Sequence, residues 1–363
     1  MNRSGHRWRS AVAALGVAVV AAGSLVTGVQ ASSPLAAVFH GTQSHCVDGV
    51  SNHTLTALNL YDGPNIVEIA STLHRSATTG RFHACFATSF VDHDLTLIAS
   101  SNFGPVQYTI PNLTVPIDRV TDRVSGRSHA NHSVSVRAYD CVVQPGISCP
   151  RVATRTTRVS ASGHYSTDLT SVFDLRGTDK VTVTDTSRHG DTWLVFRYVP
   201  YFEPFNNNKL VAGVLNPGQS ATFRLRHEAG GTLMDTQHTT ADLGLGNILF
   251  VFVPWIRTGR QVTADFASDA RVTLPNTTTT FEISHGDQLI HVRCLPNRPM
   301  RIYWQGTHQH GVPRTADSHG RATINLSSAE SDHFRLPDGS GVDTICQTPA
   351  GDLIRATGFA PLP

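Results

Sequence analysis

The sequence predicts an all-β fold, a tandem array of β-sandwich modules behind an N-terminal targeting segment. Three observations support this fold class. One phrase of turn and strand residues recurs four times along the chain. Short runs rich in Val, Thr, Phe and Tyr alternate with turns marked by Gly or Pro. No long stretch places its apolar residues at helical spacing.

The recurring phrase is a turn, an alternating strand, a threonine-rich strand and a Gly-Asp turn. Its four copies begin at Val47, Val124, Val211 and Leu289. In the second copy Val134 and Val136 flank Ser135, the alternation expected when one face of a strand is buried. The repeat therefore indicates several similar β modules rather than one large domain.

The strands expected in the chain are short and lie between turn signals such as Thr79-Gly80, Ser162-Gly163 and Thr258-Gly259. We expect strands at His83–Phe86, Leu95–Ala99, Ser133–Tyr139, Lys180–Thr184, Trp193–Val199, Ala221–Leu225, Leu249–Val253 and Arg321–Leu326. Many short strands without helices favour sandwiches or barrels.

A strand followed by proline closes each copy, at Pro111, Pro200, Pro275 and Pro361. Proline cannot donate to a β ladder, so each marks the end of a sheet. The mature chain then divides into modules at 32–115, 116–201, 202–279 and 280–363. We expect each module to enclose its own core, and the joints 112–116 and 203–208 to be semi-stiff.

The second copy also carries a family resemblance. Its residues Val124, Gly126, Ala130, Asn131, Val134 and Val136 are followed by Gly163-His164-Tyr165-Ser166, then by Leu175, Gly177, Asp179, Val181, Val183 and Gly190-Asp191. This pattern resembles the immunoglobulin-like β-sandwich repeat modules of secreted bacterial surface proteins. The resemblance implies a fold and a spacer or adhesion role. It implies no active site, since the matching residues are turn and core positions.

The N-terminus has the composition of a secretory signal peptide, residues 1–31. Arg3, Arg7 and Arg9 precede an apolar stretch over 11–26, and Val29-Gln30-Ala31 offers a cleavage site after Ala31. Retention of the apolar stretch as a single-pass anchor is the alternative. We expect a secreted, extracellular mature chain without a stable membrane span, and association with the cell surface is a further alternative.

Six cysteines lie behind this segment, and an even count in a secreted chain indicates disulfides. The repeats favour pairing within modules, as Cys46–Cys85, Cys141–Cys149 and Cys294–Cys346. Free buried thiols are one alternative. A zinc site is another, although no C-x-x-C spacing is present.

The chain contains 19 histidines, which invites a search for metal ligands. His308 and His310 are the best candidates, because alternate residues of a strand share a face. His291 and His319 lie in the same module and could add ligands. A solvated turn between Gly306 and Gly311 is the favoured interpretation, so no metal or cofactor is expected. Asp92-His93-Asp94 and the Asp338–Gly341 stretch with Asp343 are likewise interpreted as turns.

Aromatic residues offer a different kind of site. Trp193, Trp255 and Trp304 occur once in each of the last three modules, and we expect Trp304 in the core beside the Cys294–Cys346 disulfide. A second group, Tyr198, Tyr201, Phe202 and Phe205, lies at a predicted joint, as an apolar hinge or a ligand patch. Hinge packing is the favoured interpretation.

The function expected from these features is non-catalytic. A net charge of +2 without basic clusters argues against nucleic acid as a partner. A surface spacer, adhesin or matrix protein that binds an extracellular protein or a cell-wall glycan fits best. An extracellular carbohydrate-binding protein and a secreted metal-dependent enzyme at His308 and His310 remain as alternatives. A core continuous over several modules, or a deep polar cavity between them, would weigh against the non-enzymatic interpretation.

Overall fold

The computed structural model divides the chain into two compact units, Met1–Pro34 and Leu35–Pro363. It describes residues 37–42, 46–51, 54–70, 72–76, 78–87, 95–101, 104–142, 149–266, 270–275, 279–284, 287–304, 311–326, 336 and 340–359. The predicted signal peptide lies outside these residues. All structural statements below concern the second unit.

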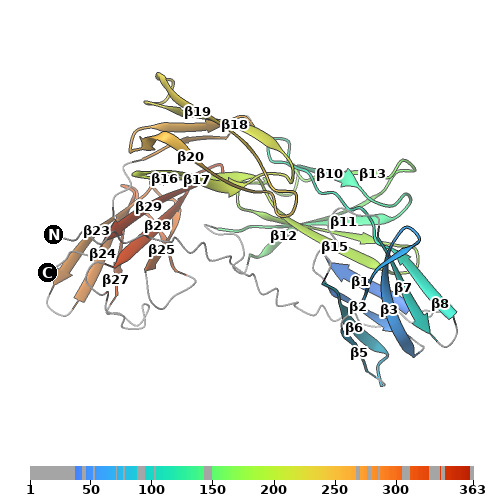
Figure 1. Ribbon diagram of the computed structural model, residues 1–363. Helices are drawn as coiled ribbons and strands as arrows, with labels where there is room; N and C mark the ends of the chain where they lie inside the picture. Colours follow the sequence, from blue (N-terminus) through green and yellow to red (C-terminus); the bar gives the residue numbers. More distant parts are fainter. Residues whose placement is uncertain are drawn as a thin grey trace, which may run out of the picture. The chain divides into compact units, whose positions relative to one another are not determined.

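The described residues form 29 β-strands and no helix, which confirms the all-β prediction (Figure 1). All eight strands expected from the sequence are present, the strand Ser133–Tyr139 with the expected bounds and the other seven with ends that differ by at most three residues. Among the described residues, no helix is long and apolar enough to cross a membrane.

Three sheets contain the strands up to residue 198. The largest has eight strands in the order β12 (Arg151–Arg158), β11 (Ser133–Tyr139), β14 (Lys180–Thr186), β15 (Thr192–Tyr198), β1 (Ala37–Thr42), β2 (Cys46–Ser51), β6 (Arg81–Cys85) and β5 (Thr72–Arg75). A four-stranded sheet contains β4 (Asn65–Ile69), β3 (Leu55–Asp62), β7 (Leu95–Ser101) and β8 (Gly104–Thr109). A three-stranded sheet contains β13 (His164–Asp168), β10 (Arg123–Arg127) and β9 (Ile117–Asp118).

Three further sheets contain the rest. The largest has seven strands in the order β20 (Asn247–Ile256), β17 (Asn208–Val214), β16 (Tyr201–Asn206), β29 (Leu353–Phe359), β28 (Gly341–Gln347), β25 (Pro299–Trp304) and β26 (Val312–Thr315). A four-stranded sheet contains β19 (Leu233–Thr240), β18 (Ser220–Arg226), β21 (Gln261–Ala264) and β22 (Arg271–Thr273). A three-stranded sheet contains β23 (Thr279–Ser284), β24 (Asp287–Arg293) and β27 (Arg321–Asn325).

The repeated phrase of the sequence is the corner at which the chain crosses from one sheet to the other. The start of the phrase spans β2 and β3 in the first copy, β10 and β11 in the second, β17 and β18 in the third, and β24 and β25 in the fourth. In every copy these two strands belong to different sheets. The turn between them is therefore the point where a sandwich passes from one layer to the next.

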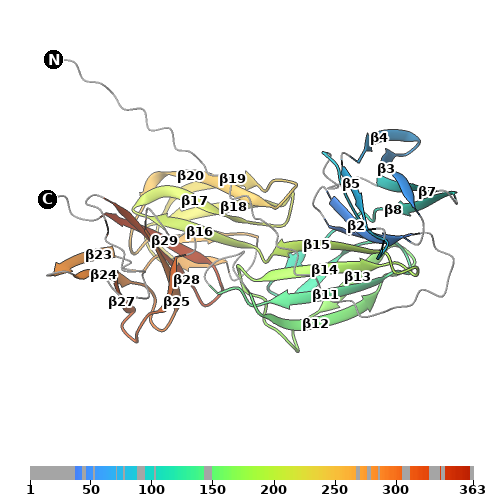
Figure 2. The same cartoon turned by 90° about the horizontal axis from the view of Figure 1, so that it is seen from below.

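The two largest sheets continue across predicted module boundaries through parallel pairs. β1 pairs with β15, with Gly41 opposite Trp193. β16 pairs with β29, with Phe205 opposite Arg355. Figure 2 shows β15, β14, β11 and β12 side by side in the eight-stranded sheet. The division into four modules stays a prediction, since strands on both sides of a boundary share a sheet.

The expectation of one separate core per module was wrong. One cluster of buried apolar side chains runs from Phe39 to Val199, and a second from Phe202 to Ile354. Each cluster covers two predicted modules. Close backbone approach explains the first: a Cβ on Gly41 would lie 1.8 Å from the Trp193 ring, so only glycine lets β1 approach β15 this closely.

The expected joint at 203–208 was also wrong, because these residues belong to β16 and β17. Pro204 misled the interpretation, since proline is rare inside a sheet. Pairing with β17 covers Tyr201–Pro204, whereas pairing with β29 begins only at Phe205. Pro204 therefore sits where the ladder to β29 has not yet started, and its ladder partner is Val211 of β17.

Candidate functional site

Three disulfides join Cys46 to Cys85, Cys141 to Cys149, and Cys294 to Cys346. These are the pairs that the repeats favoured. Trp304 is buried in the same cluster as Cys294 and Cys346, as expected. The cysteines therefore serve as cross-links, and no thiolate is available for a zinc ion at any of these bridges.

The predicted metal ligands gain no support. His308 and His310 lie outside the described residues. The His291 Nδ1 atom is 2.8 Å from Thr323 Oγ1, and His319 is exposed in the turn after β26. In the described part of the chain, the single group of three or more potential ligand side chains is Cys46, His83 and Cys85, of which two are disulfide-bonded.

The other sequence candidates have structural roles or lie outside the description. Asp92-His93-Asp94 and Asp338-Gly339 are not among the described residues. Gly341 and Asp343 belong to strand β28 rather than to a cation-binding loop. The Asp343 carboxylate accepts a hydrogen bond from the Thr357 hydroxyl at 2.5 Å, so it serves a cross-strand contact.

A charged cluster occupies the middle of the outward face of the seven-stranded sheet. Glu203 and Arg355 form an ion pair at 2.6 Å, and Arg355 Nη1 lies 3.8 Å from Asp343. The Arg355 guanidinium also lies 4.9 Å from the centre of the Phe205 ring, within cation–π range. Burial works to lower the pKa of Arg355, but Glu203 and Asp343 raise it above its ordinary value.

Tyr303 borders this cluster on β25, opposite Asp343. Burial raises the pKa of Tyr303 to about 12, so its hydroxyl stays protonated at neutral pH. Tyr198 and Tyr303 pack against a small buried group that contains Tyr201 and Leu353. The favoured packing role of the aromatic residues near 200 therefore agrees with the structure for Tyr198 and Tyr201.

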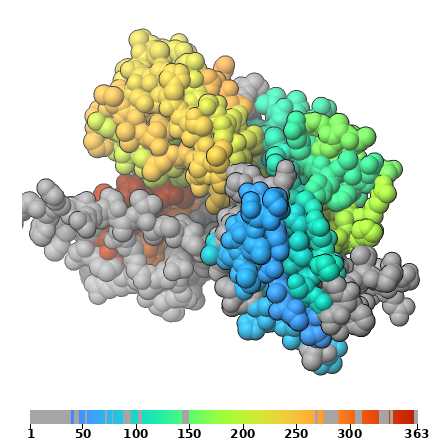
Figure 3. Space-filling model, turned by 45° about the vertical axis from the view of Figure 1, so that its right-hand side comes forward, coloured from blue at the N-terminus to red at the C-terminus, as the bar shows by residue number. Residues whose placement is uncertain are grey.

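Strand β20 carries an apolar stripe on the same outward face. Its Leu249 shares a row with Ala212 and Glu203, which fixes the face on which it lies. The stripe, defined as Leu249, Val251, Val253 and Trp255, has exposed fractions of 61%, 58%, 72% and 50%. No residue of β20 is charged, although it is the terminal strand of the sheet. Figure 3 shows this part of the chain, in yellow, at the surface.

Exposed apolar stripes of this kind are uncommon on proteins without a partner. Terminal strands usually carry lysine or other charges that oppose association. Contiguous apolar patches on a monomer mark interaction sites more often than not once they reach a few hundred Å². The β20 stripe is therefore the best candidate contact surface in the described chain.

A buried ion pair holds the segment before β10 to the segment before β29. The Arg119 guanidinium donates to both carboxylate oxygens of Asp352 at 3.0 Å, with side chains that are 1% and 0% exposed. Arg119 also donates to the carbonyl of Pro200 at 2.8 Å, and Asp352 accepts from the Phe202 backbone N–H at 3.1 Å. We call these four residues the joint, and from here on the word no longer refers to the predicted connectors 112–116 and 203–208.

Further contacts surround the joint. The Gly177 N–H donates to the Ala350 carbonyl at 2.9 Å, and the Gln347 side-chain amide donates to the Thr178 hydroxyl at 2.9 Å. Asn216 closes a two-way pair with the backbone of Ile117, at 2.9 and 3.1 Å. Together these contacts connect the parts before and after residue 200 through polar groups that are largely shielded from water.

A pocket of about 530 Å³ lies beside the Asn112–Pro116 connector. Its lining includes Trp193, Tyr165 and Leu243, and three basic side chains, Arg127, His164 and Arg197. The described residues that line it include no carboxylate. A paired acid and base, as hydrolytic sites need, is therefore missing from this pocket.

Sequence reasoning missed the joint and the β20 stripe. Arg119 and Asp352 are 233 positions apart, and no local pattern marks them as partners. The sequence did mark the strand that carries the stripe, because the ten residues Asn247–Ile256 include no charge. A run of this kind predicts a strand buried on both faces. That prediction is wrong for β20, since one face of the strand is exposed.

Comparison with known proteins gives no family. No family model matches the chain, and no curated sequence does. Among solved structures, a tetra-tandem repeat from the extending region of a large adhesion protein is 15% identical, with a TM-score of 0.17, and covers 90% of this chain and 100% of its own. The BSP domain of a biofilm-associated protein is 8% identical, with a TM-score of 0.19, and covers 90% and 95%.

The FN1–FN3 domains of chicken CNTN1 are 10% identical, with a TM-score of 0.15, and cover 66% of this chain and 97% of their own. By their names, the first of these structures is a tandem repeat and the last contains several FN domains. At these TM-scores the likeness carries no argument about how the whole chain is arranged or what it binds. The functional argument therefore rests on this chain's own residues.

Proposed function

We propose that this protein is a secreted, non-catalytic spacer of the adhesion type. The joint carries this proposal: Arg119, just after β9, and Asp352, just before β29, form a fully buried, bidentate ion pair, and the two strands belong to different sheets. Paired segments of this kind cannot swing independently without exposing or separating two buried charges, which costs several kcal/mol. A spacer that must hold a binding surface at a fixed orientation needs such a connection.

The proposed contact surface is the β20 stripe, and the proposed partner is a protein. Leu249, Val251 and Val253 are aliphatic, and a flat aliphatic row suits the apolar core of a protein interface better than a sugar. The Glu203–Arg355–Asp343 cluster begins two strands away on the same face and is mostly buried, with side chains that are 8%, 28% and 36% exposed. Extracellular proteins of a surface or matrix are therefore the expected partners.

The non-catalytic part of the proposal no longer rests on module independence. The buried clusters each cover two predicted modules, a condition named above as weighing against it. In its place stands the lining of the 530 Å³ pocket, whose described residues include no carboxylate, although a more open pocket of about 1130 Å³ is lined by Asp118 and Asp265. His308 and His310 stay a prediction for a metal-dependent enzyme.

Small-angle scattering of the mature chain tests the spacer role. The wild type and the variant Arg119→Met, which leaves the buried Asp352 carboxylate without the guanidinium, are compared, with circular dichroism to confirm that both are folded. We expect the variant to show a larger maximum dimension and a broader distance distribution, because its segments are no longer tied. Identical scattering curves for a folded variant would contradict the proposal.

Trp255 keeps carbohydrate binding as a second candidate. Its side chain is half exposed, whereas Trp193 and Trp304 are buried. Sugar binding favours flat, exposed rings, and Trp255 offers one. Affinity electrophoresis with insoluble-polysaccharide extracts, comparing the wild type with Trp255→Ala, tests this. Equal mobility of the two proteins in every gel would dismiss the glycan partner.

A further inference from the structure

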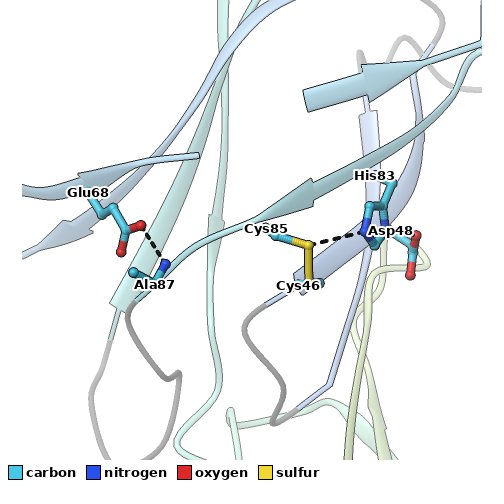
Figure 4. The surroundings of a disulfide bond; sticks show 6 residues. All are labelled: Cys46, Asp48, Glu68, His83, Cys85 and Ala87. Atoms are coloured by element: carbon cyan, nitrogen blue, oxygen red, sulfur yellow. Dashed lines mark hydrogen bonds and ion pairs between the residues drawn. A yellow bond between two sulfur atoms is a disulfide. The ribbon is translucent and has the colours of Figure 1, made fainter. Parts of the chain in front are cut away.

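A disulfide on the exposed side of the eight-stranded sheet has an unusual neighbourhood (Figure 4). Cys46 on β2 and Cys85 on β6 are direct partners in register, and Asp48 and His83 are the next pair but one. Residues two apart on a strand share a face, so these four side chains lie together. All four are at least partly exposed to solvent.

One imidazole links the disulfide to a carboxylate. The His83 Nε2 atom is 3.1 Å from Cys85 Sγ, and its Nδ1 atom is 2.8 Å from Asp48 Oδ1. A carboxylate on one ring nitrogen fixes the orientation of the ring and directs the other nitrogen at its target. The arrangement Asp48–His83–Cys85 therefore has the order of a carboxylate, a base and a sulfur in activated cysteine sites.

The surroundings hold these groups in place while leaving them reachable. The side chains of His83 and Asp48 are 46% and 65% exposed. Past the end of β6, the Ala87 N–H donates to the Glu68 carboxylate on β4 at 2.5 Å, which anchors the chain beyond Cys85. A small molecule or a flexible peptide can therefore approach the sulfurs without unfolding the sheet.

The other two disulfides differ in accessibility. Cys294 and Cys346 are buried in the second core cluster, where disulfides are chemically inert. Cys141 is also buried, whereas its partner Cys149 is partly exposed, as Cys46 and Cys85 are. The Cys46–Cys85 bridge is also the only one that the described residues gather with a histidine into a group of three potential ligands, all within 4.8 Å. A metal would need thiolates there, and the bridge supplies none.

We propose that Cys46–Cys85 is a site of thiol–disulfide exchange with accessible free thiols, in which His83 assists the departure of the Cys85 sulfur. The incoming thiolate attacks Cys46 Sγ, and a new sulfur–sulfur bond forms there. The Cys46–Cys85 bond breaks, and its electron pair goes to Cys85 Sγ. His83 as imidazolium stabilises or protonates that thiolate, so charge and atoms balance without an added oxidant.

The choice of Cys46 as the attacked sulfur follows from the geometry. Exchange is faster when the leaving sulfur is the better leaving group, and a neighbouring imidazolium makes a thiolate more stable. His83 lies against Cys85, so Cys85 leaves and Cys46 receives the incoming thiol. The product is a protein joined through Cys46 to the thiol-bearing molecule. The attachment is a single covalent event and does not require repeated turnover.

Folded mature protein is treated with reduced glutathione at neutral pH in the presence of EDTA, and exchange is stopped with acid. Peptide mass spectrometry then gives the rate and position of glutathione attachment for each of the three disulfides. We expect attachment mainly at Cys46. The His83→Gln variant should react about ten-fold to a hundred-fold more slowly, the range expected for loss of a positioned proton donor.

The variant His74→Gln is the matched control. His74 lies directly opposite His83 on β5 and is also exposed, but it is on the strand farther from Cys46, and the β5 residue opposite Cys85 is Thr72. It should leave the rate unchanged. Asp48→Asn is a second variant and should slow the reaction by less than His83→Gln, because the ring is kept and only its orientation is loosened.

Three results would overturn the proposal: an unchanged rate in folded His83→Gln, equal slowing in His74→Gln, or attachment mainly at Cys85. If His83→Gln fails to fold, the Cys46→Ser variant is used instead. The alkylation rate of its single free thiol, Cys85, is compared with and without Asp48→Asn, and equal rates would count against the proposal.

This inference does not depend on the spacer role, since it concerns a different sheet. The scattering experiment and the exchange experiment can therefore each fail without affecting the other proposal.

Discussion

Arg119 and Asp352 meet through two parallel hydrogen bonds of 3.0 Å although 233 positions separate them in the chain. Both side chains are buried, so each charge depends on the other. Removal of one partner leaves an uncompensated buried charge, and such changes cost about 3–5 kcal/mol. We therefore expect Arg119→Met to lower the free energy of unfolding by about that amount.

The double variant Arg119→Met/Asp352→Leu provides the control. Replacing both partners by apolar groups is often close to neutral, so the double variant should be more stable than either single variant. Urea denaturation of all four proteins gives the double-mutant cycle. Additive losses from the two single changes would show that the pair is not coupled, against the geometry.

Gly41 and Trp193 meet where the eight-stranded sheet crosses a predicted module boundary. A Cβ on Gly41 would lie 1.8 Å from the ring, and Trp193 is only 2% exposed, so the ring has no room to move away. Overpacking of this kind costs about 1–3 kcal/mol or more. We expect Gly41→Ala to lower the thermal unfolding temperature and to expose Trp193, seen as a red shift in its fluorescence.

Gly244→Ala is the control for backbone effects. Its added Cβ would meet nothing closer than 3.4 Å, which is ordinary contact. Alanine at a compatible glycine position changes stability by only about 0.4–1 kcal/mol, usually upward. Equal losses from Gly41→Ala and Gly244→Ala would mean that the contact with Trp193 does not decide the result.

Asp179 gives the chain a pH-dependent stability. Its carboxylate accepts hydrogen bonds from the backbone N–H groups of Cys141 at 3.0 Å and Arg176 at 2.8 Å. Burial outweighs these bonds and raises the pKa of Asp179 from its ordinary value of 3.8 to about 7. Between these two pH values the folded protein binds a proton that the unfolded chain has lost, so stability falls as pH rises through this window.

The variant Asp179→Asn removes this titration. An upper limit for the effect is about 4 kcal/mol, from roughly three pH units at 1.36 kcal/mol each. Asparagine has one hydrogen-bond acceptor oxygen fewer than aspartate at every pH. The measured quantity is therefore the slope of the unfolding free energy against pH and not the absolute stability. The stability difference between wild type and variant should shrink from pH 4 to pH 8. A constant difference over that range would show that Asp179 stays ionised in the folded protein.

The sequence predicted the strands well because they depend on local alternation. In the Ser133–Tyr139 strand, Val134 and Val136 are buried and Ser135 is not, as the period of two requires. The disulfides were accessible to reasoning because each pair lies within one copy of the repeat. Both predictions use information from within about 50 residues of chain.

Long-range partners could not be predicted in the same way. The β1–β15 and β16–β29 pairs join strands about 150 residues apart, and nothing in the Gly41 or Phe205 neighbourhood names its partner. Pro204 even argued against the strand that contains it. Side-chain sites built from such contacts, including the joint and the Glu203–Arg355 pair, become visible only when the sheets are assembled.

The β20 stripe gives the last prediction. Changing Leu249, Val251 and Val253 together to threonine should leave stability nearly unaltered, because exposed substitutions are usually within about 0.5 kcal/mol each and threonine keeps the strand propensity. Binding to a panel of immobilised extracellular-matrix and cell-wall proteins should fall at least ten-fold, measured by biolayer interferometry.

The buried neighbour Phe252 separates binding from folding in this test. Phe252→Ala should cost about 3–5 kcal/mol, because it empties a fully buried site on the opposite face of the same strand. If the triple threonine variant loses a similar amount, the stripe is covered in solution and is no contact surface. If it is as stable as the wild type and binds every panel protein equally well, the partner contacts another face of the chain. Stable folding with selective loss of binding is the one outcome that assigns the stripe to adhesion.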